Sequence, residues 1–288
     1  MGHNIVQAHF CHQYYLHLPF KIYRVMKCFK KITILCLFVY IPFAGIAWGV
    51  TGHRIIGQIA DGYLTKKAKT EITKILGFES IAMASNWPDF AKSDPAYNYL
   101  STWHYVNLKS GLSFDEVKNF LTADTATDAY TKINFMVREF KTNRLLSAEI
   151  KQLYVRLLIH IIGDIHQPMH LGRPDDRGGN AVKVRWFGDD ANLHSVWDSK
   201  LIDFQQLSYT EYATAINNTT LAQRKTWQKQ TLVQWMYDTY GITEKIYADV
   251  KPDQRLDYLY NFKFIAPLND QLVKGGVHLA GVFNDIFK

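Results

Sequence analysis

Apolar side chains recur at every third or fourth position through most of the chain after residue 48, as in the segments 53–60 and 153–159. This spacing places apolar groups along one side of a helix and is the main sequence signal for amphipathic α-helices. It predicts a mainly α fold. The expected helices cover residues 53–64, 66–76, 114–122, 125–143, 148–166, 191–203, 209–217, 220–239, 254–262 and 267–286.

One segment follows a different period. Residues 181–187 alternate between apolar and polar side chains and lie between Gly178-Gly179-Asn180 and Gly188-Asp189-Asp190. Alternation bounded by turn-forming residues indicates a β-strand or a short β-hairpin. Because no internal repeat or linker interrupts the pattern, we expect residues 48–288 to form a single compact multi-helical domain with one short β-hairpin.

Residues 26–47 have the three parts of a secretory signal peptide. Basic residues after Met26 precede an apolar run from Ile32, and Gly45-Ile46-Ala47 ends the segment with small residues at its third-last and last positions. Pro42 interrupts the run, which is shorter than the roughly 20 apolar residues of a membrane span. We therefore expect cleavage before Trp48 and a secreted or periplasmic mature protein without a membrane anchor. Residues 1–25 are interpreted as an upstream extension from a misplaced start codon.

Composition changes once this leader is set aside. It contains five of the 33 basic residues and no acidic residue, so the mature chain carries 28 basic against 26 acidic groups. The chain's overall basic character therefore gives no argument for binding duplex DNA by bulk charge. All three cysteines also lie in the leader, so residues 48–288 contain no disulfide. A domain of this length can bury a full-sized core without one.

Two motifs place a histidine and an aspartate four positions apart: His160 with Asp164, and His194 with Asp198. Side chains at this spacing share one face of a helix. A single pair of this kind is most often a hydrogen-bonded pair on the surface. Here the flanking residues are apolar, and an ionised carboxylate in such surroundings requires a counter-charge, which a metal ion can supply. The two motifs together indicate a polynuclear metal centre.

Four further candidates accompany these motifs. His170 follows Pro168, which must end or bend the helix and so allows His170 to return to the same side of the core. His53, Asp89 and His104 lie upstream near tryptophans. Taken one at a time, these three residues are as well explained by core filling or by a turn.

The ordered segments WGVTGH, WPD, WHY, HIIGDIHQPMH and NLHSVWD resemble the zinc-dependent single-strand nucleases of the S1/P1 type, a family of fungal secreted and plant bifunctional nucleases. The resemblance covers the chain from Trp48 to Asp198, and its joint pattern is highly specific. It implies the fold shared by these nucleases and zinc phospholipase C. It also implies a secreted endonuclease that cleaves single-stranded DNA and RNA to 5′-phosphate products and removes the 3′-phosphate of nucleotides.

By this resemblance the protein binds three zinc ions, two close together and one more distant. The implied ligands are Asp89, His104, His160 and Asp164 for one ion; His53, the backbone amine and carbonyl of Trp48, and a shared Asp164 for its neighbour; and His170, His194 and Asp198 for the third. A free N-terminal amine can lose its proton to a metal ion, whereas a peptide nitrogen cannot bind in this way. Signal-peptide cleavage is then part of site assembly.

The expected mechanism needs no serine or cysteine nucleophile. Zinc lowers the pKa of water from 15.7 to roughly 7, and hydroxide attacks phosphorus in line. Asp164 and Asp89 are the expected catalytic carboxylates, with Asp89 orienting the attacking water. Single-stranded DNA, RNA and 3′-nucleotides are the expected substrates. We expect a monomer without a stable protein partner.

Departures from the family pattern leave substrate binding unassigned. The segment 106–111 does not match the part of some relatives that holds the base and phosphate. His166 and His278 fit no ligand position, so we expect His166 to support a ligand from behind or to lie on a helix surface, and His278 to pack between helices. Two alternatives compete with the nuclease: a zinc phospholipase C, and a non-catalytic module that uses zinc for folding.

Overall fold

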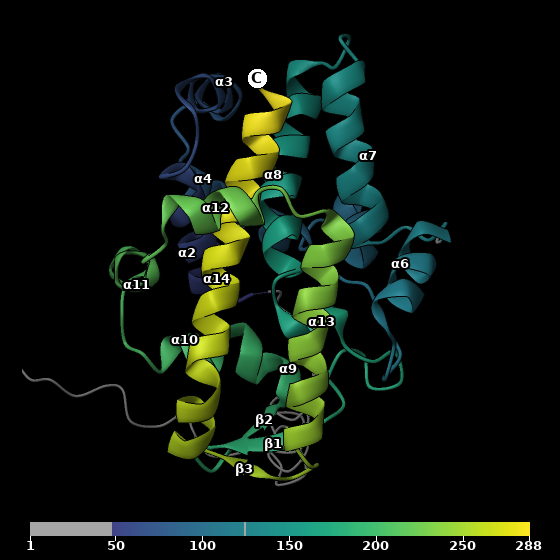
Figure 1. Cartoon of the computed structure of the whole chain (residues 1–288), viewed down its shortest axis with the longest axis vertical. Helices are drawn as coiled ribbons and strands as arrows, with labels where there is room; N and C mark the ends of the chain where they lie inside the picture. Colours follow the sequence, from purple (N-terminus) through teal and green to yellow (C-terminus); the bar gives the residue numbers. More distant parts are fainter. Residues whose placement is uncertain (1–47, 124) are drawn as a thin grey trace, which may run out of the picture. The chain divides into compact units, whose positions relative to one another are not determined.

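The computed structural model describes residues 48–123 and 125–288 (Figure 1). The signal peptide and the upstream extension expected for residues 1–47 lie outside these described residues. Within them the fold is mainly α, as the sequence predicts. The helices are α2 (Val50–Asp61), α3 (Lys66–Leu76), α4 (Ile81–Ala84), α5 (Trp87–Ala91), η1 (Pro95–His104), α6 (Phe114–Ala123), α7 (Ala129–Thr142), α8 (Ala148–Asp164), η2 (Pro168–Leu171), α9 (Leu193–Ser195), η3 (Val196–Lys200), α10 (Leu201–Asp203), α11 (Tyr209–Ile216), α12 (Leu221–Trp227), α13 (Leu232–Asp249) and α14 (Tyr258–Ile286).

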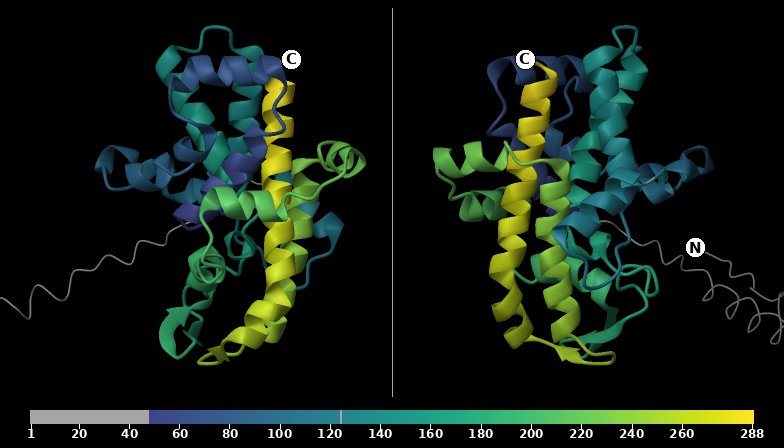
Figure 2. Two further views of the ribbon diagram at one scale, coloured as in Figure 1. Left: turned by 90° about the vertical axis from the view of Figure 1, so that its left-hand side faces the viewer. Right: turned by 45° about the vertical axis from the view of Figure 1, so that its right-hand side comes forward.

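The long helices α7, α8, α13 and α14 run lengthwise through the structure, and α14 extends along it in both views of Figure 2. The first described helix, α2, packs against the last, α14. Two glycines permit this approach, because a Cβ on Gly276 would lie 2.5 Å from Ile59 and a Cβ on Gly275 would lie 3.2 Å from Ile56. Helix α2 therefore packs closely against α14, and it also contacts α8.

The sheet has three short strands in the order β2-β1-β3, formed by Lys183–Trp186 (β1), Asp189–Asn192 (β2) and Arg255–Leu256 (β3). Strands β1 and β2 form the expected hairpin, with Lys183 opposite Asn192. Phe187 and Gly188 at its turn both have positive φ, the backbone that a tight hairpin turn requires. Strand β3 adds to β1 in parallel.

Several predicted bounds are wrong. The helix expected over 191–203 begins only at Leu193, because Ala191 and Asn192 belong to strand β2, and it continues through α9, η3 and α10. The helix expected over 220–239 is two helices, because Thr231 caps a new helix by accepting a hydrogen bond from the backbone of Gln234. The helices expected over 254–262 and 267–286 are one continuous helix that contains Pro267, preceded by strand β3. A strand of two residues such as β3 is too short to show an alternating pattern, and the sequence alone does not indicate that a helix continues through Pro267. Helices α4, α5 and η1 were also not predicted.

No helix among the described residues combines the length and the apolar character needed to cross a membrane.

Candidate metal centre

Helix α8 carries the central pair of polar residues. Ser147 caps its N-terminus by accepting a hydrogen bond from the backbone of Ile150, and apolar residues surround its last turns. His160 and Asp164 nevertheless lie on this buried stretch with no solvent exposure. The Nε2 atom of His160 is 3.2 Å from Oδ2 of Asp164. The two polar side chains therefore share one face of the helix inside the core.

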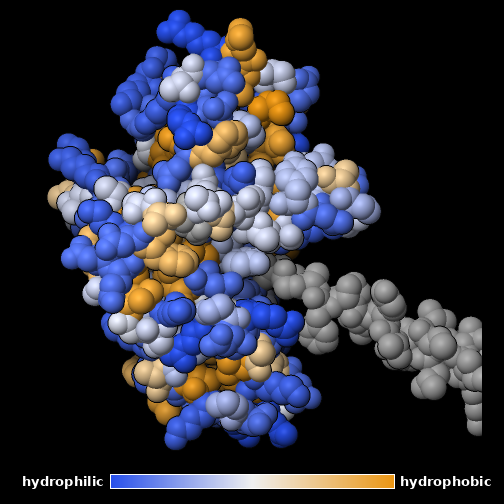
Figure 3. Space-filling view, turned by 90° about the vertical axis from the view of Figure 1, so that its right-hand side faces the viewer, coloured by the Kyte–Doolittle hydropathy of each residue, from blue (hydrophilic) through white to orange (hydrophobic). Residues whose placement is uncertain are grey.

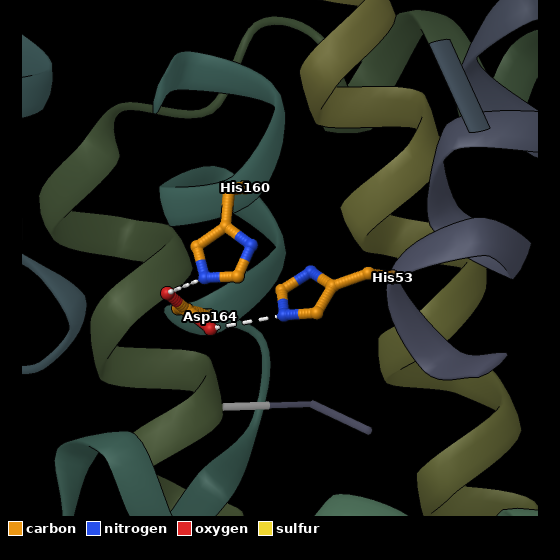
Figure 4. A group of neighbouring side chains, drawn as sticks. All are labelled: His53, His160 and Asp164. Atoms are coloured by element: carbon orange, nitrogen blue, oxygen red, sulfur yellow. Dashed lines mark ion pairs between the residues drawn. The ribbon is translucent and has the colours of Figure 1, made fainter. Parts of the chain in front are cut away.

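His53 on α2 approaches the other oxygen of the same carboxylate. Its Nε2 atom lies 3.3 Å from Oδ1 of Asp164, and its ring stacks on His160 with 3.9 Å between ring centroids. Figure 4 shows the two rings next to each other, each with a nitrogen directed at one oxygen of Asp164. Gly163 leaves room for this arrangement, since a Cβ there would lie 2.9 Å from Nδ1 of His53. Asp164 thus faces two histidines through two different oxygens.

A second group shares His160 and adds side chains from α5 and the end of η1. The Nδ1 atom of His104 is 2.9 Å from Oδ2 of Asp164 and 3.0 Å from Nε2 of His160. Oδ1 of Asp89 lies 3.6 Å from Nε2 of His160 and accepts a hydrogen bond of 2.8 Å from Lys92. Asp89, His104 and His160 are close enough to contact one cation together.

The third group combines η2 with the helical stretch from α9 to η3. Nε2 of His194 lies 3.1 Å from Oδ2 of Asp198, and Nε2 of His170 lies 3.8 Å from Oδ1 of the same residue. Helix α8 ends before Pro168, which begins η2 and directs His170 into this group. All three residues are buried, and their ligand atoms lie within 4.8 Å of one another.

Backbone carbonyl groups hold three of the histidine rings from behind. Nδ1 of His160 donates to the carbonyl of Ser85, that of His170 to the carbonyl of His104, and that of His194 to the carbonyl of Gly178, each at 2.6 Å. A proton held on Nδ1 leaves Nε2 with a free lone pair, as in most histidine ligands of metal ions. The three rings are therefore oriented as ligands would be.

Several buried polar atoms of these groups have no hydrogen-bond partner among the described residues: Nδ1 and Nε2 of His53, Nε2 of His104 and of His170, Oδ2 of Asp89, and Oδ1 of Asp164. An unsatisfied buried polar group costs about 1–3 kcal/mol. The concentration of unsatisfied nitrogen and oxygen atoms in one place is explained if these atoms bind cations. The donor set of imidazoles and carboxylates suits zinc.

The pKa values of three of these residues, His104, His170 and Asp164, favour the protonation states that metal binding requires. Burial lowers the pKa of His104 and of His170 to about 4, which keeps both rings neutral. Burial alone would raise the pKa of Asp164, but the neighbouring His160 and His170 outweigh it and hold the pKa well below its usual value. Neutral imidazole and ionised carboxylate are the ligand forms of these side chains.

Trp48 lies next to two of these groups, the one that contains Asp164 and the one that contains Asp198. It is fully buried, and its indole N–H donates a 2.8 Å hydrogen bond to the carbonyl of Gly163, the residue before Asp164. The backbone N–H of Gly49 donates a 2.6 Å hydrogen bond to the carbonyl of Asp198. The first two residues after the expected cleavage position are therefore anchored beside two of the aspartates.

Two histidines lie outside the groups. Nε2 of His166 is hydrogen-bonded at 2.7 Å to Nδ1 of His278, and both residues are buried. The alternative that His166 lies on a helix surface is wrong, because the turn after α8 folds inward against α14. His278 packs between helices as expected, stacked on Trp235 with 4.2 Å between ring centroids.

Sequence reasoning missed the groups that support the site. The carbonyls of Ser85 and Gly178 leave no side-chain signature. Gln167, which donates a hydrogen bond to Asp198, and Lys92, which pairs with Asp89, are each within three positions of a candidate ligand. Proximity in sequence was the one available signal for these two side chains.

Comparison with known proteins agrees with this geometry. The sequence pattern of the S1/P1 Nuclease family matches residues 48–288. Endonuclease 2 of Arabidopsis thaliana is 27% identical over 266 residues, which is 83% of this chain and 90% of that protein. Nuclease P1 of Penicillium citrinum is 26% identical over 271 residues, 83% of this chain and 97% of that protein. Nuclease S1 of Aspergillus oryzae is 27% identical over 164 residues, 54% of each chain.

The family match spans the whole described domain, including the helices after Asp198 that the resemblance in the sequence did not cover. It selects the nucleases over the phospholipase C alternative. The family is zinc-dependent, in agreement with the clustered histidines and aspartates. The chain therefore belongs to the S1/P1 nuclease family of hydrolases acting on phosphodiester bonds.

Proposed function

We propose that the mature chain is an exported, zinc-dependent endonuclease that hydrolyses single-stranded DNA and RNA to 5′-phosphate products and also removes 3′-phosphates from nucleotides. The observation that carries this proposal is the gathering of eight buried or nearly buried histidines and aspartates, from five separate parts of the chain, into groups able to hold metal ions.

In this proposal three zinc ions bind. Asp89, His104, His160 and Asp164 hold the first. His53, Asp164 and the backbone of Trp48 hold the second. The two oxygens of Asp164 support a shared role, because one faces His53 and the other faces His160 and His104. His170, His194 and Asp198 would hold the third ion with three protein side chains, which would leave a position for a group of the substrate.

When bound, zinc supplies Lewis acidity toward the phosphate and lowers the pKa of water to near neutrality. The protein's own residues then position the reactants. Oδ2 of Asp89 has no partner among the described residues and would bind the first ion, while Oδ1, which accepts from Lys92, has a second lone pair that can accept a hydrogen bond from the attacking water. His160, His170 and His194 are kept in place by their backbone acceptors. No serine or cysteine is required as a nucleophile.

The preparation that tests the function is mature protein beginning at Trp48. Its zinc content is measured by elemental analysis, and its activity is measured on single-stranded DNA, RNA, a 3′-nucleotide and phosphatidylcholine. We expect about three zinc ions and EDTA-sensitive hydrolysis of the nucleic acids and the 3′-nucleotide. Zinc without hydrolysis would support the non-catalytic module, and hydrolysis of the lipid alone would support a phospholipase. Protein without zinc would contradict the nuclease and the module together.

The role of the N-terminus has its own test. A form that retains Met before Trp48 has a peptide nitrogen where the proposal requires a free amine. We expect this form to bind about two zinc ions and to lose most of its activity. Equal zinc content and equal specific activity in the two forms would refute the role of cleavage in completing the site.

A further inference from the structure

Helix α13 carries none of the candidate ligands, yet one of its faces contacts the segments around the third group. Figure 3 looks onto the side of the molecule that carries α6 and shows many hydrophilic side chains with apolar ones between them. Tyr240, Thr243 and Tyr247 of α13 are largely withdrawn from the surface, since the first two are buried and Tyr247 is half-buried. Their spacing of three and four residues places them on one helix face. Thr243 donates a 2.6 Å hydrogen bond to the carbonyl of Pro168, which begins the η2 helix of His170.

Tyr247 on this face holds the loop of residues 172–180, which follows η2. Its hydroxyl donates a 2.8 Å hydrogen bond to Oδ1 of Asp176 and accepts one of 3.3 Å from the backbone N–H of Arg173. The Arg173 guanidinium lies 4.1 Å from the centroid of the Tyr247 ring. Burial raises the pKa of Tyr247 to about 13, so its hydroxyl stays protonated and can donate to Asp176. One hydroxyl group therefore connects α13 to two points of the loop.

Asp176 connects Tyr247 to the part of the loop that orients His194. Its Oδ1 atom also accepts a 2.7 Å hydrogen bond from the backbone N–H of Gly179. The carbonyl of the preceding residue, Gly178, accepts the hydrogen bond from Nδ1 of His194. Gly178 and Gly179 both have positive φ, and a Cβ on Gly178 would lie 2.5 Å from the carbonyl oxygen of Met169. The turn that carries this acceptor is therefore closely packed and is linked to Tyr247 by two hydrogen bonds.

We propose that Tyr247 is a positioning residue of the third zinc site, where it acts through Asp176 and the Gly178 carbonyl on the ring of His194. The inference rests on the proposed function, which assigns a zinc ion to His194 and its two neighbours. It gives α13 a role in metal binding, although this helix follows the last candidate ligand in the sequence. Removal of a group that orients a ligand typically costs 10–100-fold in metal affinity. Because Tyr247 acts through a further residue, we expect a loss of about tenfold, at the lower end of this range.

The test compares two variants of α13. Tyr247→Phe removes the hydroxyl that holds the loop. Tyr240→Phe is the matched control, because its hydroxyl also takes part in two hydrogen bonds, to the carbonyl of Lys109 and from the backbone N–H of Leu112. A competing chelator should remove one zinc ion about tenfold more readily from Tyr247→Phe than from the wild type, whereas Tyr240→Phe should retain its zinc as the wild type does. Equal retention in the two variants would overturn the inference.

Combined and conservative variants locate the effect. Asp198→Asn removes a ligand of the third site, so Tyr247→Phe should cause no further loss of zinc in that background. Asp176→Asn keeps an Oδ1 acceptor for both hydrogen bonds and should retain zinc as the wild type does, whereas Asp176→Ala should match Tyr247→Phe. A further loss in the Asp198→Asn background, or equal zinc retention in the two Asp176 variants, would show that Tyr247 does not act on this site through Asp176.

Hydrogen exchange in EDTA tests the same link without zinc and without activity. The backbone N–H of Gly179 should exchange about fivefold faster in Tyr247→Phe than in Tyr240→Phe, the ratio expected for a weakened hydrogen bond. Equal exchange rates would overturn the inference. If the wild type binds zinc and these differences hold but no nucleic acid is hydrolysed, the role of Tyr247 stands and the proposed nuclease fails. If nucleic acid is hydrolysed and Tyr247→Phe behaves as the control does, the role of Tyr247 alone fails.

Discussion

Replacement of Gly163 by alanine should weaken the metal centre while leaving α8 largely intact. The added Cβ would lie 2.9 Å from Nδ1 and 3.3 Å from Cε1 of His53. Carbon atoms in good contact are about 3.5–4.0 Å apart, so the ring must move by about 0.5 Å. His53 is stacked on His160 and faces Asp164, which limits where it can go.

The magnitudes separate the effect on the helix from the effect on the site. Alanine is favoured over glycine in a helix by about 0.8–1 kcal/mol, and overpacking costs about 1–3 kcal/mol. The metal-free protein should therefore lose no more than about 2 kcal/mol of unfolding free energy. A shift of about 0.5 Å exceeds the ±0.2 Å tolerance of metal–ligand distances. Changes to the groups that orient ligands typically cost 10–100-fold in metal affinity.

Gly241 on α13 supplies the matched control, because a Cβ there meets no atom within 4 Å. Gly241→Ala should raise stability by about 0.8–1 kcal/mol and leave zinc content unchanged. The assay measures zinc retained against a competing chelator, together with thermal unfolding with and without EDTA. Zinc retention in Gly163→Ala equal to that of Gly241→Ala would refute the steric reasoning and the placement of His53 at a metal.

Three further predictions concern the ions and the buried histidines. EDTA should lower Tm by on the order of 10 °C, measured by calorimetry, because each orphaned polar atom costs about 1–3 kcal/mol; an unchanged Tm would contradict zinc binding. Asp198→Asn should reduce zinc content by about one ion and activity at least about 100-fold, and a full complement of zinc in this variant would argue against the third site. Burial lowers the pKa of His166 to about 4, so the unfolded chain binds more protons between about pH 4 and 6.5. In EDTA, His166 alone should lower the unfolding free energy by on the order of 3 kcal/mol as the pH falls from about 6.5 to 4, and His104 and His170 should add to this fall. The total fall should be less steep in His278→Phe, and equal slopes of the two proteins in denaturant titrations would argue against the pair.

The sequence was informative where periodicity and chemistry coincide. The apolar surroundings of His160 and Asp164 predicted both the buried helix α8 and its unusual polar residues, because burial of a charge requires compensation. Pro168 predicted the turn that directs His170 away from the helix axis. Both inferences depend only on residues that are close together in the sequence.

Features that depend on distant contacts were not predictable in this way. The segment WPD reads as a turn, yet Pro88 occupies the first turn of α5, where a missing backbone N–H has no cost. The inward position of His166 depends on His278, which is 112 positions away in sequence. The acceptor for Nδ1 of His160 is a backbone carbonyl, which any residue would supply. Such partners are set by the tertiary fold rather than by residue type.

The packing of α2 on α14 makes the metal centre depend on a contact between helices that are synthesised at very different times. His53 belongs to the first described helix, whereas Gly275 and Gly276, which allow α14 to approach that helix, come much later in the chain. A nascent or truncated chain that lacks α14 lacks the most extensive packing partner of α2, the helix that carries His53. Contacts between chain ends are slow to form because the intervening segment must first be closed into a loop. The centre is therefore complete only after α14 has been made and has packed on α2, and a nascent chain that ends before α14 would carry the ligands without this support.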